Sequence, residues 1–179
     1  MIRVFDVIFA LFGLIFLSPL FLIIFIVGWF VNGSPIFKQE RIGQKQNPFV
    51  MLKFRTMKPG TVSVATHLLD EMSNSAFERF LRRTKLDELP QLLNVLYGEM
   101  SLVGPRPCLL NQVELIHLRD QLRIFEARPG ITGLAQIQGI DMSSPSVLAE
   151  LDAKMLRNLN IFSYFSYIFV TIVGKKLNE

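Results

Sequence analysis

The architecture of this chain is set by residues 4–31, which read VFDVIFALFGLIFLSPLFLIIFIVGWFV. Leucine, isoleucine, phenylalanine and valine dominate this stretch, and no charged residue occurs between positions 7 and 37. A run of this length is long enough to cross the roughly 30 Å hydrocarbon core of a bilayer. Because the rest of the chain carries nearly all of the charge, the sequence divides into an apolar N-terminal piece and a polar remainder.

Ser18 and Pro19 break the apolar run in its middle. Proline removes a helical hydrogen bond and the preceding serine can bond back to the backbone, so we expect a sharp bend. Each arm is then about 12 residues or roughly 18 Å long, which is about half a bilayer. Basic residues flank the segment on both sides, which disfavours a topology in which one flank crosses: Arg3, Lys38, Arg41 and Lys45. We therefore predict a re-entrant helix that enters and leaves on the cytoplasmic face, with a kinked spanning helix as the alternative.

The length and composition of the chain bound its organisation. Its 179 residues suffice for one ordinary domain beside the membrane segment. The turn-forming run Asn-Gly-Ser-Pro at 32–35 is the predicted boundary, which gives a membrane-embedded piece over 1–33 and a second domain over 34–179. A net charge of +4 fits an anionic membrane surface or a phosphorylated substrate better than nucleic acid. The one cysteine, Cys108, excludes an internal disulfide and a cysteine-based zinc site.

The second domain is predicted to be α/β mixed and mostly helical, with one small β-hairpin. Its strands are expected at 36–42 and 49–57, and 61–76 reads as a mobile surface loop. The remaining predictions are loop with a short strand over 127–139 and helices over 77–81, 89–96, 109–125 and 145–159. The apolar, aromatic segment 161–173 is too short to span a membrane. It is typical either of an amphipathic interfacial helix at the lipid headgroups or of a core helix.

The stretch with the most chemistry is residues 84–107, TKLDELPQLLNVLYGEMSLVGPRP. It sets Asp87 and Glu88 just ahead of Pro90, a residue that a helix tolerates only in its first turn. The helix is therefore predicted to begin between residues 88 and 90, with Asp87 at or just before the N-cap. Free amides and the helix dipole favour a bound phosphate there. On this fragment alone, a plain N-cap followed by a first-turn acid is the simpler interpretation.

The basic residues elsewhere in the chain favour phosphate chemistry. Strand alternation would put Lys53 and Arg55 of the KFRTM run on one face. Arginine forms paired bonds to phosphate, and a rigid backbone keeps it aimed. Such arginines lie one turn before the acids or beside proline and glycine: Arg82, Arg83, Arg106 and Arg128. Two acids beside a diphosphate imply Mg²⁺, with one acid holding the metal and the other attacking phosphorus.

A set of motifs, taken in order, resembles the bacterial sugar transferases, the monotopic phosphoglycosyl transferases that begin glycan assembly on a polyprenol carrier. The motifs are SP at 18–19, KFRTM at 53–57, DELPQL at 87–92, MSLVGPRP at 100–107 and RPGITGLAQ at 128–136. The resemblance runs over nearly the whole chain, and the short length resembles the minimal form of the family. The sequence departs from the family after this point, because QGID at 138–141 stands where Asn-Gly-Arg is common.

The resemblance implies a two-step reaction on the cytoplasmic face of the bacterial inner membrane, with 34–179 as the catalytic domain. Asp87 would attack the β-phosphate of a UDP-sugar, release UMP and hold the phosphosugar until undecaprenyl phosphate takes it. Glu88 would ligate the cofactor Mg²⁺. The product would start a glycan such as O-antigen, capsule, exopolysaccharide or a glycoprotein glycan. The residues expected to bind the substrates are Lys53, Arg55, Arg82, Arg106, Arg128, Gln136 and Asp152.

Two other functions are compatible with parts of the sequence. A non-enzymatic membrane anchor could recruit glycan-assembly enzymes through a basic face, but it would not require the Asp87–Glu88 pair. A phosphatase that passes through an aspartyl-phosphate would carry an Asp-x-Asp signature, which is missing here. The expected partners are a UDP-sugar, undecaprenyl phosphate and membrane lipid. The sequence identifies neither the sugar nor the glycan, and it leaves a homodimer open.

Overall fold

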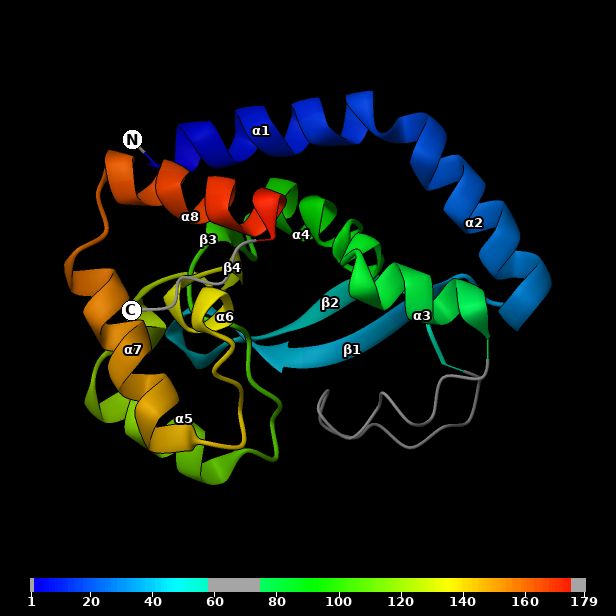
Figure 1. Cartoon of the computed structure of the whole chain (residues 1–179). Coiled ribbons are helices and arrows are strands. Elements are labelled where there is room, and N and C mark those ends of the chain that lie inside the picture. Colours follow the sequence, from blue (N-terminus) through cyan, green and yellow to red (C-terminus); the bar gives the residue numbers. More distant parts are fainter. Residues whose placement is uncertain (1, 58–74, 175–179) are drawn as a thin grey trace.

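In the computed structural model the apolar N-terminal segment forms two helices that meet at a sharp bend (Figure 1). The structure describes residues 2–57 and 75–174; the predicted surface loop lies outside these ranges except for its last two residues. The described chain is mostly helical, with two small two-stranded sheets. The prediction of a mostly helical fold with a small hairpin is therefore confirmed.

The bend lies at the predicted place. Helix α1 (Ile2–Phe16) and helix α2 (Ser18–Asn32) make an angle of 64°. The hydroxyl of Ser18 donates to the carbonyl of Ile15 (2.8 Å), and Pro19 lies in the first turn of α2. Neither helix is long and apolar enough to cross a membrane alone; the bent pair is so only when both arms are taken together. Large apolar side chains are exposed on both arms, among them Phe16 and Phe30.

The hairpin consists of strand β1 (Ile36–Ile42) and strand β2 (Pro48–Phe54), which pair antiparallel from Ile36 opposite Phe54 to Ile42 opposite Pro48. The turn between them is the short 3₁₀ helix η1 (Gln44–Gln46). Strand β2 ends at Phe54, three residues earlier than predicted. The edge of β2 is satisfied by the buried side chain of Asn94, which accepts from Leu52 N (3.0 Å) and donates to Val50 O (2.8 Å).

A second, parallel pair joins β3 (Ser101–Val103) to β4 (Gly130–Thr132). Two glycines allow the chains to approach: a Cβ on Gly130 would lie 2.0 Å from the nitrogen of Gly104. Strand β4 falls within the short strand predicted over 127–139, whereas its partner β3 was not predicted. The residues that form α6 (Leu134–Gln138) were predicted to be loop.

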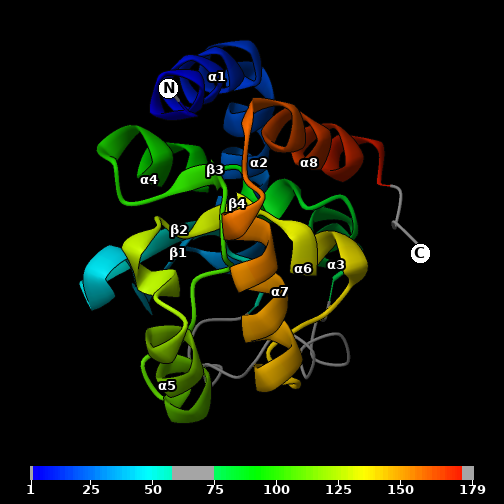
Figure 2. The same cartoon turned by 90° about the vertical axis from the view of Figure 1, so that its left-hand side faces the viewer.

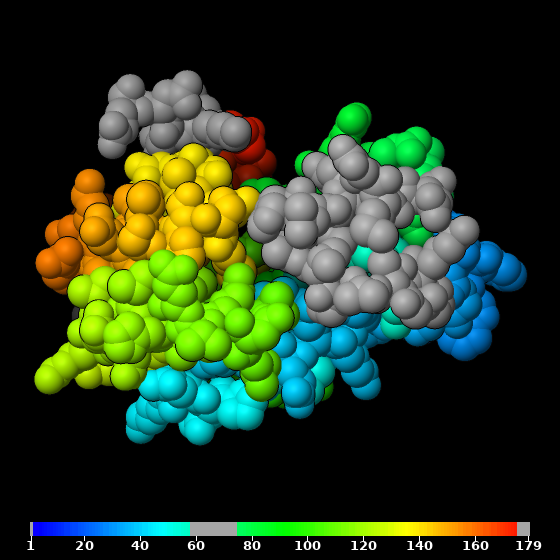
Figure 3. Space-filling model, turned by 90° about the horizontal axis from the view of Figure 1, so that it is seen from below, coloured from blue at the N-terminus to red at the C-terminus, as the bar shows by residue number. Residues whose placement is uncertain are grey.

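The remaining helices surround these sheets: α3 (Ala76–Arg83), η3 (Leu86–Glu88), α4 (Gln91–Tyr97), α5 (Val113–Gln121), η4 (Ile124–Glu126), α7 (Pro145–Arg157) and α8 (Ile161–Val173). The predictions of α7 and α8 are confirmed. The helix predicted over 109–125 is wrong in extent, because the left-handed backbone at Arg123 (φ 54°) separates α5 from η4. On the face opposite α1, α5 lies beside the hairpin (Figure 3), and the side chain of Gln44 donates to Glu126 O (2.7 Å).

Helix α1 is attached to the rest of the protein by two charged side chains. Asp6 is 2% exposed, and its Oδ1 accepts from Ser101 Oγ, Leu102 N and Tyr164 Oη at 2.8–2.9 Å. Arg3 donates to carbonyls at the end of α4, including Val95 O (2.6 Å). These bonds hold α1 over α4 and beside α8 (Figures 1 and 2).

Helix α8 is buried on one face and exposed on the other. Tyr164 on its inner face is fully buried. Phe162, Phe169 and Ile172 are 88%, 67% and 78% exposed, so the opposite face is apolar and uncovered. The helix therefore packs on the domain and also presents an apolar surface on the side of the molecule where α1 lies (Figure 2).

Candidate active site

Asp87 and Glu88 lie in η3, the 3₁₀ turn that leads into α4. Lys85 starts the turn in the left-handed conformation (φ 57°), and Glu88 N donates to Lys85 O (3.1 Å). Pro90 is the N-cap of α4, which begins one residue later. The prediction that Asp87 lies at or just before the N-cap is therefore wrong, because the 3₁₀ turn places Asp87 three residues ahead of the N-cap, Pro90.

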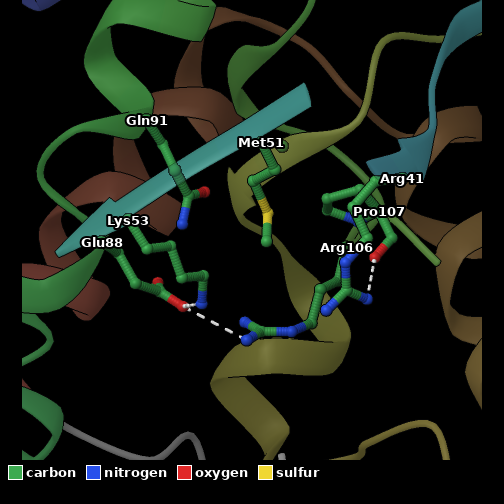
Figure 4. Close-up of a pocket in the computed structure, with 8 residues that line it drawn as sticks. Arg41, Met51, Lys53, Glu88, Gln91, Arg106 and Pro107 are labelled. Atoms are coloured by element: carbon green, nitrogen blue, oxygen red, sulfur yellow. Dashed lines mark hydrogen bonds and ion pairs between the residues drawn. The ribbon is translucent and has the colours of Figure 1, made fainter. Parts of the chain in front are cut away.

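Glu88 is the anchor of the site. Its Oε1 accepts from Lys53 Nζ at 2.9 Å and from Arg106 Nη2 at 3.2 Å (Figure 4). Burial by itself would raise the pKa of Glu88, but these two cations outweigh it and lower the pKa to about 2. The Glu88 carboxylate is therefore ionised at every physiological pH, and it joins strand β2 to the Gly-Pro-Arg-Pro loop.

The Asp87 carboxylate differs from that of Glu88 in its contacts and in its pKa. Among the residues that the structure describes, its carboxylate forms neither a hydrogen bond nor an ion pair. Burial raises its pKa to about 6, and the charge of Glu88 acts in the same direction. Lys53, Arg106 and Arg82 oppose that rise. The result is a carboxylate that is mostly ionised at neutral pH, is more basic than an ordinary aspartate, and has no hydrogen-bond or ion-pair partner among the described residues.

The pocket beside Glu88 is built from four separate parts of the chain (Figure 4). Its lining residues are Arg41, Met51, Lys53, Glu88, Gln91, Arg106, Pro107 and Gly130. Arg41 and Gln91, both of which are buried, were not among the residues predicted for the site. Arg41 was treated only as a flanking charge; its position in the predicted strand 36–42, where alternate residues share a face, was the available signal.

Arg41 makes the pocket more cationic. It is 7% exposed, donates through Nη1 to Pro107 O (3.1 Å), and binds the side chain of Gln39 through its other nitrogens. Burial and the charge of Arg106 lower the pKa of Arg41 to about 10, so it remains protonated at neutral pH. Three cations, those of Arg41, Lys53 and Arg106, thus line one small pocket, which suits an anionic ligand.

The predicted pair Lys53 and Arg55 does not act as a unit. Strand β2 ends between them, so Lys53 turns to Glu88 while Arg55 donates to Ser34 O (2.9 Å) and Ile36 O (3.3 Å). Arg55 also covers the ring of Phe37. Arg82 donates to Thr56 O (2.7 Å) and Thr56 Oγ1 (3.0 Å), near enough to Asp87 to affect its pKa.

Three further predicted residues do not line this pocket. Arg128 donates to Gly98 O (2.8 Å) at the end of α4. The amide of Gln136 is enclosed with no hydrogen-bond partner among the described residues. Asp152 is fully buried and pairs with Arg119 Nη2 at 2.5 Å. Roles for these residues in substrate binding stay predictions.

The side chains around η3 can be compared with the ligands that the predicted Mg²⁺ would require. Within the described ranges, no group of three or more His, Cys, Asp or Glu side chains gathers to form an all-protein cage. Mg²⁺ usually takes one or two carboxylates together with substrate phosphates and water. Asp87 and Glu88 supply two adjacent carboxylates, and both ion pairs of Glu88 use the same oxygen, Oε1. The residues present therefore fit Mg²⁺ bound jointly with a phosphorylated ligand.

Comparison with known proteins shows the family to which this chain belongs. Residues 1–176 match the family model described as bacterial sugar transferase. An uncharacterized sugar transferase, EpsL of Bacillus subtilis, is 40% identical over 171 residues, which span 95% of this chain and 84% of EpsL. The exopolysaccharide production protein ExoY of Rhizobium meliloti is 36% identical over 194 residues, 95% of this chain and 83% of ExoY.

A third relative carries a more detailed name. The UDP-glucose:undecaprenyl-phosphate glucose-1-phosphate transferase of Klebsiella pneumoniae is 33% identical over 187 residues; the match covers 99% of this chain and 40% of that longer protein. The chain belongs to the bacterial sugar transferase family. The resemblance seen in the sequence motifs is confirmed: the protein is an enzyme, and membership in this family argues against a purely non-enzymatic anchor.

Proposed function

We propose that this protein transfers a sugar 1-phosphate from a UDP-sugar to undecaprenyl phosphate, giving a polyprenyl-diphosphate sugar and UMP. This product would start glycan assembly. The observation that carries the proposal is the Asp87 carboxylate, which is partly buried, has a raised pKa and has no partner among the described residues. It lies beside Glu88, which Lys53 and Arg106 hold in place. The name of the Klebsiella pneumoniae relative supports the choice of donor and acceptor.

In the first step, a carboxylate oxygen of Asp87 attacks the β-phosphorus of the UDP-sugar. An Asp–O–P bond forms, the bond from that phosphorus to the bridging oxygen breaks, and the oxygen leaves with its electron pair on UMP. Asp87 needs no general base for this attack, because a carboxyl with a pKa of about 6 is already ionised at neutral pH. Lys53 and Arg106 stabilise the negative charge of the phosphates.

In the second step, a phosphate oxygen of undecaprenyl phosphate attacks the same phosphorus. The acyl-phosphate bond breaks, the electron pair returns to Asp87, and a diphosphate linkage remains on the lipid. The Asp87 carboxylate is regenerated, so neither step consumes a further reactant. Two substrates that enter in turn and share one covalent intermediate predict ping-pong kinetics.

Glu88 is the proposed ligand of Mg²⁺. When bound, the cation supplies charge neutralisation for the diphosphate of the donor. The protein's part is to keep Glu88 ionised, which its pKa of about 2 ensures. Lys53 and Arg106 fix the orientation of this carboxylate through its Oε1.

The proposed location is the cytoplasmic face of the bacterial inner membrane, with α1 and α2 embedded as a re-entrant pair and residues 34–179 as the catalytic domain. The 64° bend, the exposed apolar side chains of both helices and the basic flanking residues support this topology. The apolar outer face of α8 would lie in the same membrane surface. A lipid phosphate and a water-soluble nucleotide sugar could then both reach Asp87.

A UMP-release assay tests the proposal. Detergent- or nanodisc-held protein is given undecaprenyl phosphate, Mg²⁺ and a panel of UDP-sugars, beside Asp87→Asn. We expect multiple-turnover UMP release from one donor that depends on the lipid, loss of UMP release in Asp87→Asn, and no change in Glu114→Gln, which alters an exposed acid of α5 outside the pocket. Release of free phosphate would instead indicate a phosphatase, and activity that survives Asp87→Asn would exclude Asp87 as the nucleophile.

The covalent step has a direct test. With sugar-labelled UDP-sugar and no lipid acceptor, we expect label to remain on the denatured wild-type protein and to be absent from Asp87→Asn. Added undecaprenyl phosphate should discharge it. A protein that releases UMP only when both substrates are present, and never carries label, would contradict the two-step mechanism.

A further inference from the structure

The loop that carries Arg106 is held through its backbone carbonyls. Pro105 and Pro107 have no backbone N–H, so the hydrogen bonds that hold this loop are accepted mainly by its carbonyl oxygens. Four successive carbonyls, at residues 105–108, each accept a hydrogen bond; the donors, in chain order of the acceptors, are Gly130 N (2.8 Å), Arg119 Nη1 (2.8 Å), Arg41 Nη1 (3.1 Å) and Ile42 N (3.0 Å). Elements from three regions of the sequence therefore meet on one short loop.

The donor to the carbonyl of Arg106 is itself fixed. Arg119 of α5 is 1% exposed, and its Nη2 pairs with Oδ2 of Asp152 on α7, which is fully buried. A guanidinium is a rigid planar fork. With one nitrogen on the Asp152 carboxylate, the other is aimed at Arg106 O. The ion pair between α5 and α7 therefore fixes the direction of the hydrogen bond from Arg119 to the Arg106 carbonyl.

The carbonyl that Arg119 binds belongs to the residue whose side chain reaches the active site. Arg106 Nη2 lies 3.2 Å from Glu88 Oε1. The direction in which the Arg106 side chain leaves the backbone depends on the peptide that Arg119 holds. Helix stability alone does not require such a pair, because buried ion pairs can often be replaced by apolar side chains without loss of stability.

We infer that Arg119 and Asp152 are positioning residues, which act through the carbonyl of Arg106 to place its guanidinium beside Glu88 and the phosphates of the substrate. The inference deepens the proposed function and rests on it for the catalytic readout. It assigns to Asp152 a role at a distance from the substrate, in place of the direct contact that the sequence resemblance implied. The site that the pair serves is the diphosphate subsite at Arg106.

The test must separate positioning from stability. Arg119→Met/Asp152→Val replaces both partners with apolar side chains, so that no uncompensated charge stays buried. Thermal unfolding reports whether the fold survives. The matched control is Arg123→Gln/Glu126→Gln, which removes a neighbouring ion pair whose side chains are 83% and 74% exposed, with the same zero change in net charge.

A mutant cycle then asks whether the pair acts through Arg106. Wild type, the Met/Val double variant, Arg106→Gln and the triple combination are compared by the Kd for inorganic diphosphate in titration calorimetry and by kcat/KM for UMP release. We expect the double variant to lose about 10- to 100-fold in kcat/KM, as misplaced catalytic groups do. In the Arg106→Gln background, the same double change should lower kcat/KM only slightly further. The exposed control, Arg123→Gln/Glu126→Gln, should keep the wild-type kcat/KM.

Additive losses would overturn the inference, since a purely structural effect does not depend on the side chain at 106. Wild-type diphosphate affinity and turnover in a folded double variant would overturn it as well. Failure of the proposed function looks different: the wild type would release no UMP from any UDP-sugar. The diphosphate-binding cycle would still decide whether Arg119 and Asp152 place Arg106.

Discussion

Asp87 and Glu88 are neighbours in the chain, yet the pKa of Asp87 is raised to about 6 while that of Glu88 is lowered to about 2. The difference follows from their contacts. Glu88 Oε1 takes the ion pairs with both Lys53 and Arg106, and the Asp87 carboxylate has no such bond among the described residues. One turn of 3₁₀ helix thus holds a fixed, permanently charged acid beside a more basic carboxylate suited to attack on phosphorus.

The raised pKa of Asp87 predicts the acid limb of the pH profile. Attack requires the ionised carboxylate, so kcat/KM should fall as the pH drops through about 6, with a slope approaching tenfold per pH unit below that value. The measurement is UMP release under subsaturating donor from pH 4.5 to 8. An acid limb centred near pH 4, the range of an unperturbed aspartate, would contradict the raised pKa.

The same shift predicts that Asp87 lowers stability. Its folded-state pKa of about 6 exceeds the ordinary 3.8, so the folded protein binds more protons between these values and loses stability as the pH rises through that window. At pH 7.5, Asp87→Asn should therefore raise the free energy of unfolding by about 1 to 3 kcal/mol, allowing for partial exposure. Thermal unfolding in detergent should show a higher midpoint for Asp87→Asn than for the wild type at pH 7.5, and this difference should disappear near pH 4. An inactive variant that is also less stable at pH 7.5 would argue against this.

Replacement of Glu88 should lower the free energy of unfolding, whereas replacement of Asp87 should raise it. Glu88→Gln leaves Lys53 and Arg106 partly buried without their carboxylate, which should cost about 2 to 4 kcal/mol at pH 7. The folded-state pKa lies below the ordinary 4.5, so this contribution is present above pH 4.5 and is lost as the pH falls toward about 2. The gap between wild type and variant in thermal unfolding should shrink over that range. The exposed change Glu114→Gln should leave the midpoint unchanged at each pH.

The attachment of α1 depends on Asp6. Asp6→Ala leaves the donors on Ser101, Leu102 and Tyr164 without their acceptor, with an expected loss of about 2 to 4 kcal/mol. Tyr164→Phe deletes one of these donors and should cost only about 1 kcal/mol. The matched control is Tyr167→Phe, because within the described residues the Tyr167 hydroxyl makes no hydrogen bond. Equal midpoints for Asp6→Ala and Tyr167→Phe in thermal unfolding would show that Asp6 does not tie α1 down.

The re-entrant topology can be tested by cysteine labelling. The native Cys108 is fully buried, so it should give little background. One cysteine is placed ahead of Met1 and another at the exposed position of Lys38, in separate proteins. Both should react with a membrane-impermeant maleimide in inside-out vesicles and neither in right-side-out vesicles. Labelling of the two from opposite sides would establish a spanning segment instead.

Predictions that depended on short-range chemistry agree with the structure. The bend at Ser18–Pro19 and the starts of β1, α7 and α8 come from proline, turn residues and hydrophobic periodicity, whose effects act over a few residues. The motifs also sufficed to recognise the family, since each is a contiguous run. Element ends were less predictable: β2 stops at Phe54, and a left-handed residue at Arg123 divides the helix expected over 109–125.

The sequence by itself determined the apolar segment and its break, the hairpin and most helices, and it indicated the Asp87–Glu88 pair as the candidate site of chemistry. Only the tertiary structure decided that Glu88 would pair with two cations, that Arg41 would line the pocket, and that Asp152 would pair with Arg119. Each of these contacts joins residues 18 or more positions apart in the sequence. Such contacts are selected by the packing of the whole chain and by the electrostatic cost of burying a charge without a partner, neither of which is written in a local motif.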